Sequence, residues 1–383
     1  MYVSTRSELH ELIEQMRGSE VLAVDTEFHS ERTYYPKLCL IQLGSDEVCA
    51  IVDPLQVDDL TPLRELFEDR GMVKVFHSGN QDIDILNRAI GAVPAPVFDT
   101  QVAAGLLGHS QQTGYGALVK AFCEVALPKA DSLTDWTRRP LTDAQVEYAL
   151  DDVRYLPNIY HIMRKRLVDS GRLDWLADDF AQLADPESYR SRPEEAWRKV
   201  KRVSSLTRKQ LAVAQAVAAW RERAAQHRDI PRKWMLADEH VVEIARRAPR
   251  SKAALFEVRG VSDHIGDRQA AEIVEEIVAA LERDPDTWPK VQHRAHAQSE
   301  SAGVVDCMLA LLHLRARENG VASQIIATKD DLVRLARGEG DGLALMSGWR
   351  RKLVGDELLD LLDGKVGMCI QDGTLKVTKS PQT

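Results

Sequence analysis

The chain has 383 residues, of which 44% are hydrophobic and 28% are charged, and this composition is typical of a water-soluble protein with two or three domains. No run approaches the roughly 18 apolar residues of a membrane span, and the amphipathic segment 1–16 does not have the pattern of a signal peptide. The formal net charge of −9, taken alone, argues against a nucleic-acid partner.

The distribution of charge along the chain is compatible with a nucleic-acid partner, and the positions of the cysteines indicate the compartment. Residues 1–190 hold 18 Lys and Arg against 31 Asp and Glu, whereas residues 191–383 hold 32 against 28. An acidic half that would bind cations is therefore joined to a mildly basic half that would bind phosphates, unless the asymmetry is chance. The five cysteines are scattered and form no CxxC pair, so we expect a cytoplasmic protein without disulfides or a zinc site.

The first half of the chain predicts a mixed sheet flanked by helices. Thr5 and Glu8 form a capping box ahead of apolar residues at helical spacing, so a helix is expected to begin there. Apolar runs bounded by loops predict strands at 21–24, 38–43, 48–52, 73–76 and 97–98. Helical periodicity predicts helices at 60–67, 80–90, 101–107 and from 142 to about 183. Strands joined first by a hairpin and then by helices imply an α/β domain over residues 1–185.

The second half predicts only helices. The arginine-rich stretch 186–205 is expected to be a basic linker or a wrapping arm. Two helical domains follow at 206–284 and 302–378, separated by a polar linker at 285–301. Their helices are predicted at 206–223, 240–247, 267–281, 304–319, 329–336, 349–354 and 355–362.

Two carboxylates of one short segment are the first candidates for chemistry. Asp25 and Glu27 follow the apolar run 21–24, and side chains two residues apart on a strand point to the same face. Like charges side by side on a half-buried strand are destabilising in the absence of a cation. The alternative is a solvated strand end or turn, in which neither carboxylate binds a ligand.

Two later segments add further acidic residues. Asp82 and Asp84 lie at the start of one predicted helix but point in different directions, so spacing does not choose between them. A helix N-terminus also favours acidic residues for its own stability. Tyr148 and Asp152 lie four residues apart in a helical stretch and share a face. The phenol could position or deprotonate a water beside that carboxylate, although a buried tyrosine bonded to an acid is the commoner arrangement.

Acidic residues in several segments that read as buried predict a metal site. Carboxylates that converge inside a protein without enough Lys or Arg usually have a cation as partner, and hard oxygen ligands suit Mg²⁺ or Mn²⁺. A pair of such ions is what phosphodiester hydrolysis needs, because one activates water and the other stabilises the leaving oxygen. The sequence therefore predicts a metal-dependent nuclease.

The spacing of these residues closely resembles the DEDD superfamily of 3′→5′ exonucleases, whose fold is ribonuclease H-like. The matches are Asp25 and Glu27 in the first motif, Asp82 in the second, and Tyr148-x-x-x-Asp152 in the third. The alternative third motif needs a histidine where this chain has Glu147, so the resemblance is to the tyrosine subclass. It also selects Asp82 over Asp84, a choice that periodicity leaves open.

Longer segments resemble the ribonuclease D family over nearly the whole chain. They are DTEFHSERTYYPKLCLIQLG, FHSGNQDIDIL, FDTQVAAGLLG and DWTRRPLTDAQVEYALDDVRYL. The two helical blocks resemble HRDC domains, and IATKDDLVRLARG with LMSGWRRKLVGDELLDLLDG looks typical of the second copy. One mild departure is Asp151, where the family often has a small or apolar residue.

The resemblance implies roles for particular residues. Two divalent ions, Mg²⁺ or Mn²⁺, would be held by Asp25, Glu27, Asp82 and Asp152. Tyr148 would orient the attacking water. Substrate contacts are expected, with structural roles as the alternative, at Phe28, His77, Asn80, Gln101, Arg138 and Arg139. Basic clusters beside Trp197, Trp234 and Trp349 suit contact with an RNA backbone, although cations also cover core tryptophans.

The preferred function is 3′→5′ exoribonuclease action on structured RNA, releasing nucleoside 5′-monophosphates, with trimming of tRNA 3′ ends implied by the family. RNA is the expected partner of a monomer that binds no membrane. The rivals are a DNA exonuclease of the same superfamily, a non-catalytic RNA-binding protein with a degenerate nuclease fold, and a helical interaction scaffold. No residue pattern identifies a reader of the 2′-hydroxyl.

Overall fold

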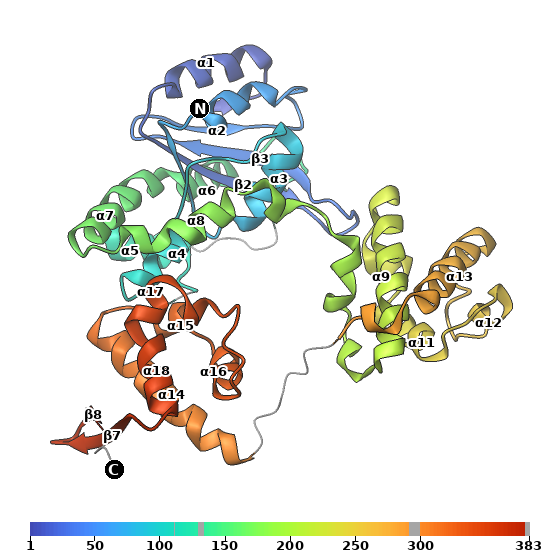
Figure 1. Cartoon of the computed structure of the whole chain (residues 1–383). Coiled ribbons are helices and arrows are strands. Elements are labelled where there is room, and N and C mark those ends of the chain that lie inside the picture. The colour runs from blue at the N-terminus through green and yellow to red at the C-terminus, as the bar shows by residue number, and fades with distance from the viewer. Residues whose placement is uncertain (111, 129–133, 291–298, 380–383) are drawn as a thin grey trace. The chain divides into compact units, whose positions relative to one another are not determined.

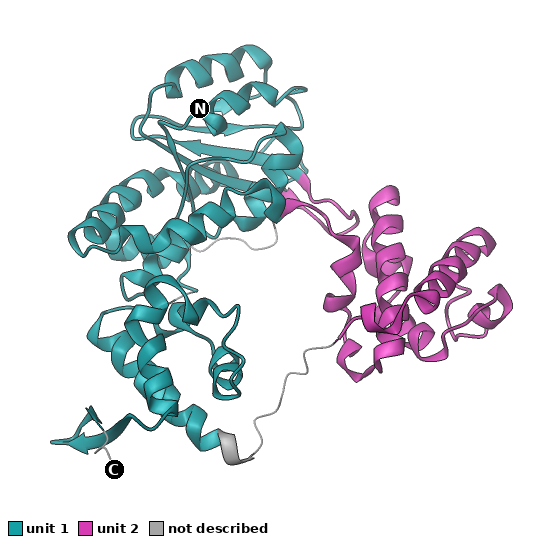
Figure 2. Ribbon diagram, in the orientation of Figure 1, with its two compact units in different colours: residues 1–27, 38–188, 294–383 teal, residues 28–37, 189–293 magenta. Residues whose placement is uncertain are grey.

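The computed structural model describes residues 1–110, 112–128, 134–290 and 299–379, and the chain divides into two units (Figure 2). Unit 1, teal in the figure, comprises residues 1–27, 38–188 and 294–383. Unit 2, magenta in the figure, comprises residues 28–37 and 189–293. The last helical block therefore belongs with the sheet, and a short piece of the expected α/β domain belongs with the first helical block.

Unit 1 is built on a six-stranded mixed sheet. Its strands are β1 (Tyr2–Val3), β2 (Val21–His29), β3 (Lys37–Gly44), β4 (Cys49–Val52), β5 (Val73–Phe76) and β6 (Val97–Asp99). They lie in the order β1-β4-β3-β2-β5-β6 (Figure 1). β3 and β4 are antiparallel, as a hairpin requires, whereas β5 is parallel to both β2 and β6, and a helical crossover (residues 80–90) connects β5 to β6. The prediction of a mixed sheet flanked by helices is confirmed.

Helices pack on both faces of this sheet, with α1 and α2 on one side and α6 and α7 on the other (Figure 1). The helices are α1 (Arg6–Met16), α2 (Arg64–Glu68), α3 (Asn80–Ile90), α4 (Thr100–Leu106), α5 (Tyr115–Cys123), α6 (Asp143–Arg154), α7 (Leu156–Asp169) and α8 (Ala177–Leu183). The expected capping box of α1 is present, because Thr5 and Glu8 each accept a hydrogen bond from the other's backbone N–H. The sequence did not predict α5, whose first turn contains Gly116, a poor helix former.

The last helical block packs into the core of unit 1. It consists of α14 (Ser299–Glu318), α15 (Ser323–Ile326), α16 (Lys329–Ala336), α17 (Gly348–Arg350), a π-helical turn (Arg351–Gly355) and α18 (Asp356–Leu362). Met308 and Leu311 of α14 belong to the same hydrophobic cluster as Val21 of β2. Trp175 and Trp349 stack with ring centres 4.7 Å apart. This block is therefore part of the folded nuclease unit.

The chain ends in a β-hairpin, so the expectation that the last domain is entirely helical is wrong. The strands β7 (Val366–Gln371) and β8 (Thr374–Lys379) are antiparallel. Asp372 and Gly373 connect them, both with positive φ (51° and 72°), as a tight two-residue hairpin turn requires. The sequence does contain a hairpin signal here, an Asp-Gly pair between alternating apolar residues, which the prediction of an all-helical domain did not take into account.

Unit 2 is a helical bundle. Its helices are α9 (Arg208–Arg228), α10 (Arg232–Met235), α11 (Asp238–Arg247), α12 (Lys252–Phe256) and α13 (Asp267–Glu282). The stretch expected as a linker, 186–205, is not free of structure: it forms 3₁₀ turns, and its Trp197 is only 3% exposed in the core of this unit. Residues 291–298 of the second expected linker, 285–301, lie outside the described residues, and α14 already begins at Ser299. No helix of the described ranges is long and apolar enough to cross a membrane.

Candidate active site

The C-terminal part of β2 carries the first two predicted ligands. Val21 and Ala23 face the core that includes α7, and the alternation of the strand continues on that face to Asp25 and Glu27. One carboxylate oxygen from each of them and one from Asp152 lie within 4.8 Å of one another. The structure thus brings together three acids from two distant segments.

Asp82 lies beside this cluster, in the first turn of α3, and is 9% exposed. Its carboxylate accepts a hydrogen bond from the hydroxyl of Thr26, the residue between the two ligands of β2. Asp84 instead forms an ion pair with Arg88 at 3.0 Å, one turn along the same helix. The structure therefore supports Asp82 as the functional acid of this segment.

α6 supplies the third motif. Thr142 caps the helix and forms a capping box with Gln145, which fixes where the helix begins. Tyr148 and Asp152 then lie one turn apart, and the Tyr148 ring lies 5.9 Å from that of Trp136. Asp151 forms an ion pair with Arg154.

Two residues near the cluster were not found from the sequence. The first is Thr26, described above, for which its position between two ligands was the only signal. The second is Tyr115 of α5, whose hydroxyl donates to the Asp151 carbonyl oxygen at 2.7 Å. Burial and the nearby Asp152 and Asp25 hold the pKa of Tyr115 above its ordinary value. No local pattern marks this tyrosine, because only the tertiary fold brings α5 to α6.

Burial is the largest influence on the ionisation of the cluster. It raises the pKa of Glu27 to about 8 and that of Asp152 to about 7, and the carboxylates near Glu27 raise its pKa further. The pKa of Asp25 is raised well above its ordinary value by burial and then by Asp82, Asp152 and Glu27. Burial also raises the pKa of Asp82, although the Thr26 hydrogen bond opposes this change. The protein therefore holds several acids where their charges repel.

The donor set fits divalent cations. Asp25, Glu27, Asp82 and Asp152 offer only oxygen atoms, and none of the ion pairs in the described ranges involves any of them. A hard divalent ion such as Mg²⁺ or Mn²⁺ supplies the positive charge that Lys and Arg do not provide here. The cluster is therefore a candidate metal centre.

Comparison with known proteins decides the family. The 3′-5′ exonuclease family matches residues 1–168, and the HRDC domain family matches residues 210–277. Ribonuclease D of Acidiphilium cryptum is 38% identical over 381 residues, 99% of this chain and 97% of the relative. Ribonuclease D of Gluconacetobacter diazotrophicus is 40% identical over 374 residues, 97% of this chain and 95% of the relative. The chain belongs to the ribonuclease D family.

Solved structures agree with this assignment. The crystal structure of Escherichia coli RNase D is similar with a TM-score of 0.81 and 28% identity, covering 95% of this chain and 98% of that one. The catalytic core of RRP6 from Trypanosoma brucei, at 24% identity and a TM-score of 0.54, shares the fold over 73% of this chain and 79% of that one. The prediction of a hydrolytic 3′→5′ exoribonuclease is confirmed by the ribonuclease D relatives. The HRDC match covers one of the two helical blocks, whereas two HRDC domains were predicted.

In this member of the ribonuclease D family, a groove of about 670 Å³ opens beside the cluster. Tyr148 and Asp152 line it together with Trp136 and Arg138. The Arg138 side chain is 83% exposed and forms an ion pair with Asp135 at 3.1 Å. An exposed guanidinium in a groove next to the acids is well placed to contact a phosphate.

Arg139, an expected substrate contact, has its guanidinium engaged in bonds within the protein. Its guanidinium pairs with the buried Asp53 carboxylate at 2.5 and 2.8 Å. It also donates to the carbonyl oxygens of Cys39, Trp136 and Arg138. These bonds use the guanidinium to join the loop before α6 to the sheet, which is a structural role.

The other expected substrate contacts lie in different surroundings. His77 is hydrogen-bonded through Nδ1 to the Thr100 hydroxyl at 2.9 Å. Asn80 and Gln101 line a second hollow, of about 410 Å³, at the N-terminal ends of α3 and α4. Phe28 is half-buried and directly follows Glu27 on β2. Their roles toward a substrate stay predictions.

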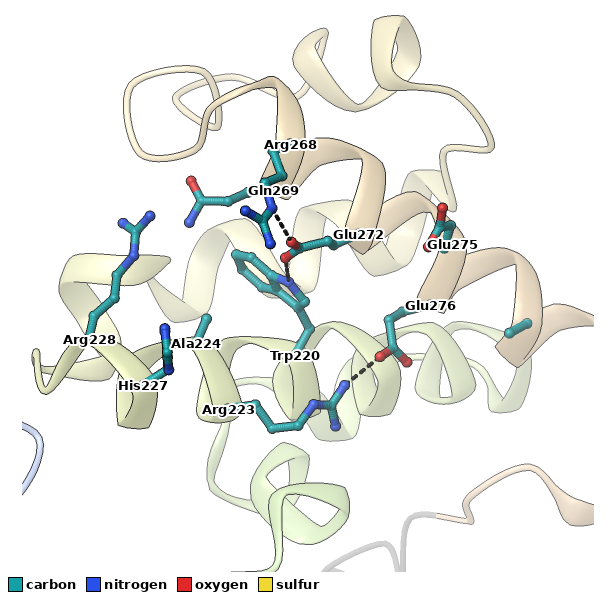
Figure 3. Close-up of a pocket in the computed structure, with 11 residues that line it drawn as sticks. Trp220, Arg223, Ala224, His227, Arg228, Arg268, Gln269, Glu272, Glu275 and Glu276 are labelled. Carbon is teal, nitrogen blue, oxygen red and sulfur yellow. Dashed lines mark hydrogen bonds and ion pairs between the residues drawn. The ribbon is translucent and has the colours of Figure 1, made fainter.

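Unit 2 contains a hollow of about 870 Å³ between α9 and α13 (Figure 3). Its arginines are largely neutralised, because Arg223 pairs with Glu276 and Arg268 with Glu272 (Figure 3). Trp220 also donates to Glu272, at 3.0 Å. With as many glutamates as arginines lining it, this hollow has no positive surplus for a nucleic-acid backbone.

In two of the three basic clusters one arginine covers the tryptophan, while the remaining Lys and Arg residues of both clusters are exposed. Arg198 lies over the Trp197 ring at 4.9 Å and Arg350 over the Trp349 ring at 4.6 Å. The third cluster differs, since Trp234 is 48% exposed. It is the best of the three candidates for contact with RNA.

Proposed function

We propose that this chain removes single nucleotides from the 3′ end of structured RNA, tRNA precursors included, by two-metal-ion hydrolysis. The observation that carries the proposal is the approach of three carboxylate oxygens to within 4.8 Å beside a fourth buried acid. The similar Escherichia coli enzyme is described as an exoribonuclease involved in structured RNA processing. We further propose that the protein acts as a monomer in the cytoplasm and belongs to the tyrosine subclass.

The proposed mechanism divides the work among the chain's own residues. Asp25, Glu27 and Asp152, with Asp82 beside them, would hold divalent ions. Bound divalent ions lower the pKa of the attacking water and neutralise charge at the departing 3′-oxygen. Burial, followed by the charges of Asp152, Glu27 and Asp25, keeps the pKa of Tyr148 above its ordinary value. A phenol that keeps its proton at neutral pH would act by orienting the attacking water.

The groove and the helical unit provide the proposed RNA contacts. Arg138 would contact a phosphate close to the scissile bond. The exposed Trp234, with Arg232 and Lys233 in the same short helix, would contact the backbone and bases farther from the 3′ end. Binding through such contacts weakens steeply with salt concentration, because each phosphate contact releases a counterion.

Paired substitutions in the full-length protein test the catalytic assignment. Asp82→Asn and Asp152→Asn should abolish Mg²⁺-dependent release of nucleoside 5′-monophosphates, because each removes a carboxylate from the cluster. Asp84→Asn and Asp151→Asn are matched controls on the same helices, and both should keep activity. Retained activity in the first pair, or equal loss in all four variants, would refute the assignment.

The degree of selectivity for RNA over DNA is a finer part of the proposal. Matched RNA and DNA oligomers, each with Mg²⁺ or EDTA, test this selectivity, since the proposal expects faster degradation of RNA and none in EDTA. Faster degradation of DNA than of RNA would contradict the proposed preference for RNA. Turnover of neither oligomer would favour a binding protein with a nuclease fold.

A further inference from the structure

The connection between β2 and β3 is held by the helical unit. Residues 28–37 continue the chain directly after the ligand Glu27, and they belong to unit 2. Within that unit, one carboxylate oxygen of Asp229 accepts hydrogen bonds from the backbone N–H groups of Tyr34 and Tyr35, both at 3.0 Å. Two successive amides therefore converge on one oxygen, which fixes the direction of the backbone at this point.

The position of Asp229 is unfavourable for a negative charge in other respects. The residue ends α9 in the left-handed conformation, with φ of 49°. A carboxylate at a helix C-terminus faces the negative end of the helix dipole. The two amides of the connection offset this cost, because hydrogen bonds to an ionised acceptor are stronger than neutral ones.

A second contact holds the same connection through a side chain. The Tyr34 hydroxyl donates to Glu222 of α9, a residue that is 7% exposed, and accepts from Gln226 at 3.1 Å. Arg232 lies over the Tyr34 ring at 5.8 Å and 3.6 Å from the Glu222 carboxylate. Both the backbone and the side chain of the connection are thus bound to α9 and the residues that follow it.

We propose that Asp229 and Glu222 are positioning residues for the nuclease site. Through Tyr34 and Tyr35 they hold residues 28–37, a segment that begins with Phe28, one peptide bond beyond the ligand Glu27. This inference rests on the proposed function. The helical unit then controls the turnover of the terminal nucleotide as well as the affinity for long RNA, because small displacements next to reacting groups lower rates strongly.

Two substitutions of one residue in the full-length protein test this positioning. Asp229→Gly keeps the left-handed backbone accessible and removes the acceptor, whereas Asp229→Asn keeps both that conformation and an oxygen acceptor. On a short RNA oligomer, Asp229→Gly should lower kcat by about three- to tenfold with little change in KM, and Asp229→Asn should restore most of the rate. Asp372→Gly is the matched control, since this aspartate also has positive φ (51°) but lies in the β7–β8 turn. It should leave kcat unchanged.

Tyr34→Phe is the second variant, because it removes the bond to Glu222 without changing the backbone. It should also lower kcat on the short oligomer and increase hydrogen exchange across residues 28–37, with an unchanged melting temperature. A rise in KM confined to long RNA would overturn the proposal in favour of a simple tether. The proposal would be overturned if kcat were unchanged in both Asp229→Gly and Tyr34→Phe. It would also be overturned if both variants lost rate and at the same time had lower melting temperatures than the wild type.

The wild-type protein separates this inference from the proposed function. If the wild type degrades RNA with Mg²⁺ and the variants equal it, only the positioning role fails. If the wild type degrades neither RNA nor DNA, the proposed function fails, and the positioning role fails with it.

Discussion

Single residues of the acid cluster are governed by the conflict between burial and charge. Glu27 and Asp152 have raised pKa values because the fold removes them from water and places like charges beside them. Such an arrangement lowers the stability of the metal-free protein. A bound cation lowers the pKa values of these carboxylates, because it stabilises the ionised form of every carboxylate that contacts it.

This conflict predicts how the metal-free protein responds to pH. The pKa of Glu27 is about 8 in the folded protein, against about 4.3 in an unfolded chain. Between these values the unfolded chain has released a proton that the folded protein retains, so the free energy of unfolding should fall as pH rises from about 5 to 8. The expected decrease in EDTA is on the order of 2 kcal/mol or more, measured by urea unfolding at several pH values.

Glu27→Gln is the control for this pH dependence, because the amide does not titrate. The variant should show a flatter profile in EDTA, and addition of Mg²⁺ should flatten the wild-type profile as well. A wild-type stability that rises from pH 5 to 8 in EDTA would contradict the raised pKa values.

Tyr148→Phe tests the proposed role of the phenol. Without the hydroxyl to orient water, turnover of RNA should fall by about 100-fold or more, while Mn²⁺ affinity measured by calorimetry stays close to the wild-type value. Equal turnover in the variant would remove the orienting role, and a parallel loss of Mn²⁺ affinity would make Tyr148 part of the metal site.

At the scale of elements, close backbone approach joins the last helical block to the nuclease helices. The carbonyl oxygen of Gly105, in α4, accepts a hydrogen bond from the Ala322 N–H at 2.8 Å. A Cβ atom at Gly105 would lie 2.7 Å from Cγ2 of Ile325, closer than real Cβ contacts allow. The absence of a side chain at Gly105 is thus what lets α15 pack against α4.

Gly105→Ala should therefore destabilise unit 1. The branched Ile325 side chain has little freedom to move aside, so we expect a loss of about 1–3 kcal/mol in urea unfolding. Gly116→Ala is the control in α5, where an added Cβ meets nothing within 4 Å. Its stability should equal or slightly exceed that of the wild type. A Gly105→Ala variant as stable as the wild type would show that the packing of α15 on α4 adapts at no cost.

At the scale of the whole molecule, the two helical blocks have different relations to the nuclease fold. The last block shares the hydrophobic core of unit 1 and is joined to the nuclease helices by specific bonds. Arg172 donates to the carbonyl oxygens of Leu106 and Asn319, and Arg350 of the last block forms an ion pair with Asp179 of α8 at 3.3 Å. Because the core is shared, removal of the whole helical half would damage the nuclease unit as well as any RNA contacts of the helices.

Deletion of residues 291–383 should lower the melting temperature by more than about 5 °C, because it exposes apolar surface of α4 and of Trp175 that the last block covers. Deletion of residues 366–383 alone, which removes the hairpin, should have a much smaller effect, because most side chains of β8 are exposed. Differential scanning calorimetry on both proteins measures the difference. Equal melting temperatures for the longer deletion and the full chain would show that the block is independent of the nuclease fold.

The sequence by itself determined β2 to β6 and most helices, because strand and helix periods are local properties, but it missed the short β1. It also indicated the candidate acids Asp25, Glu27 and Asp152, whereas the choice of Asp82 over Asp84 needed the family resemblance. It did not determine that Arg139 pairs with buried Asp53, that Tyr115 reaches α6, or that the last block packs against α4, because these depend on contacts between distant segments. It also could not place residues 28–37 with the first helical unit. Only the tertiary structure decided these points, since burial and partner choice arise when segments far apart in the chain meet.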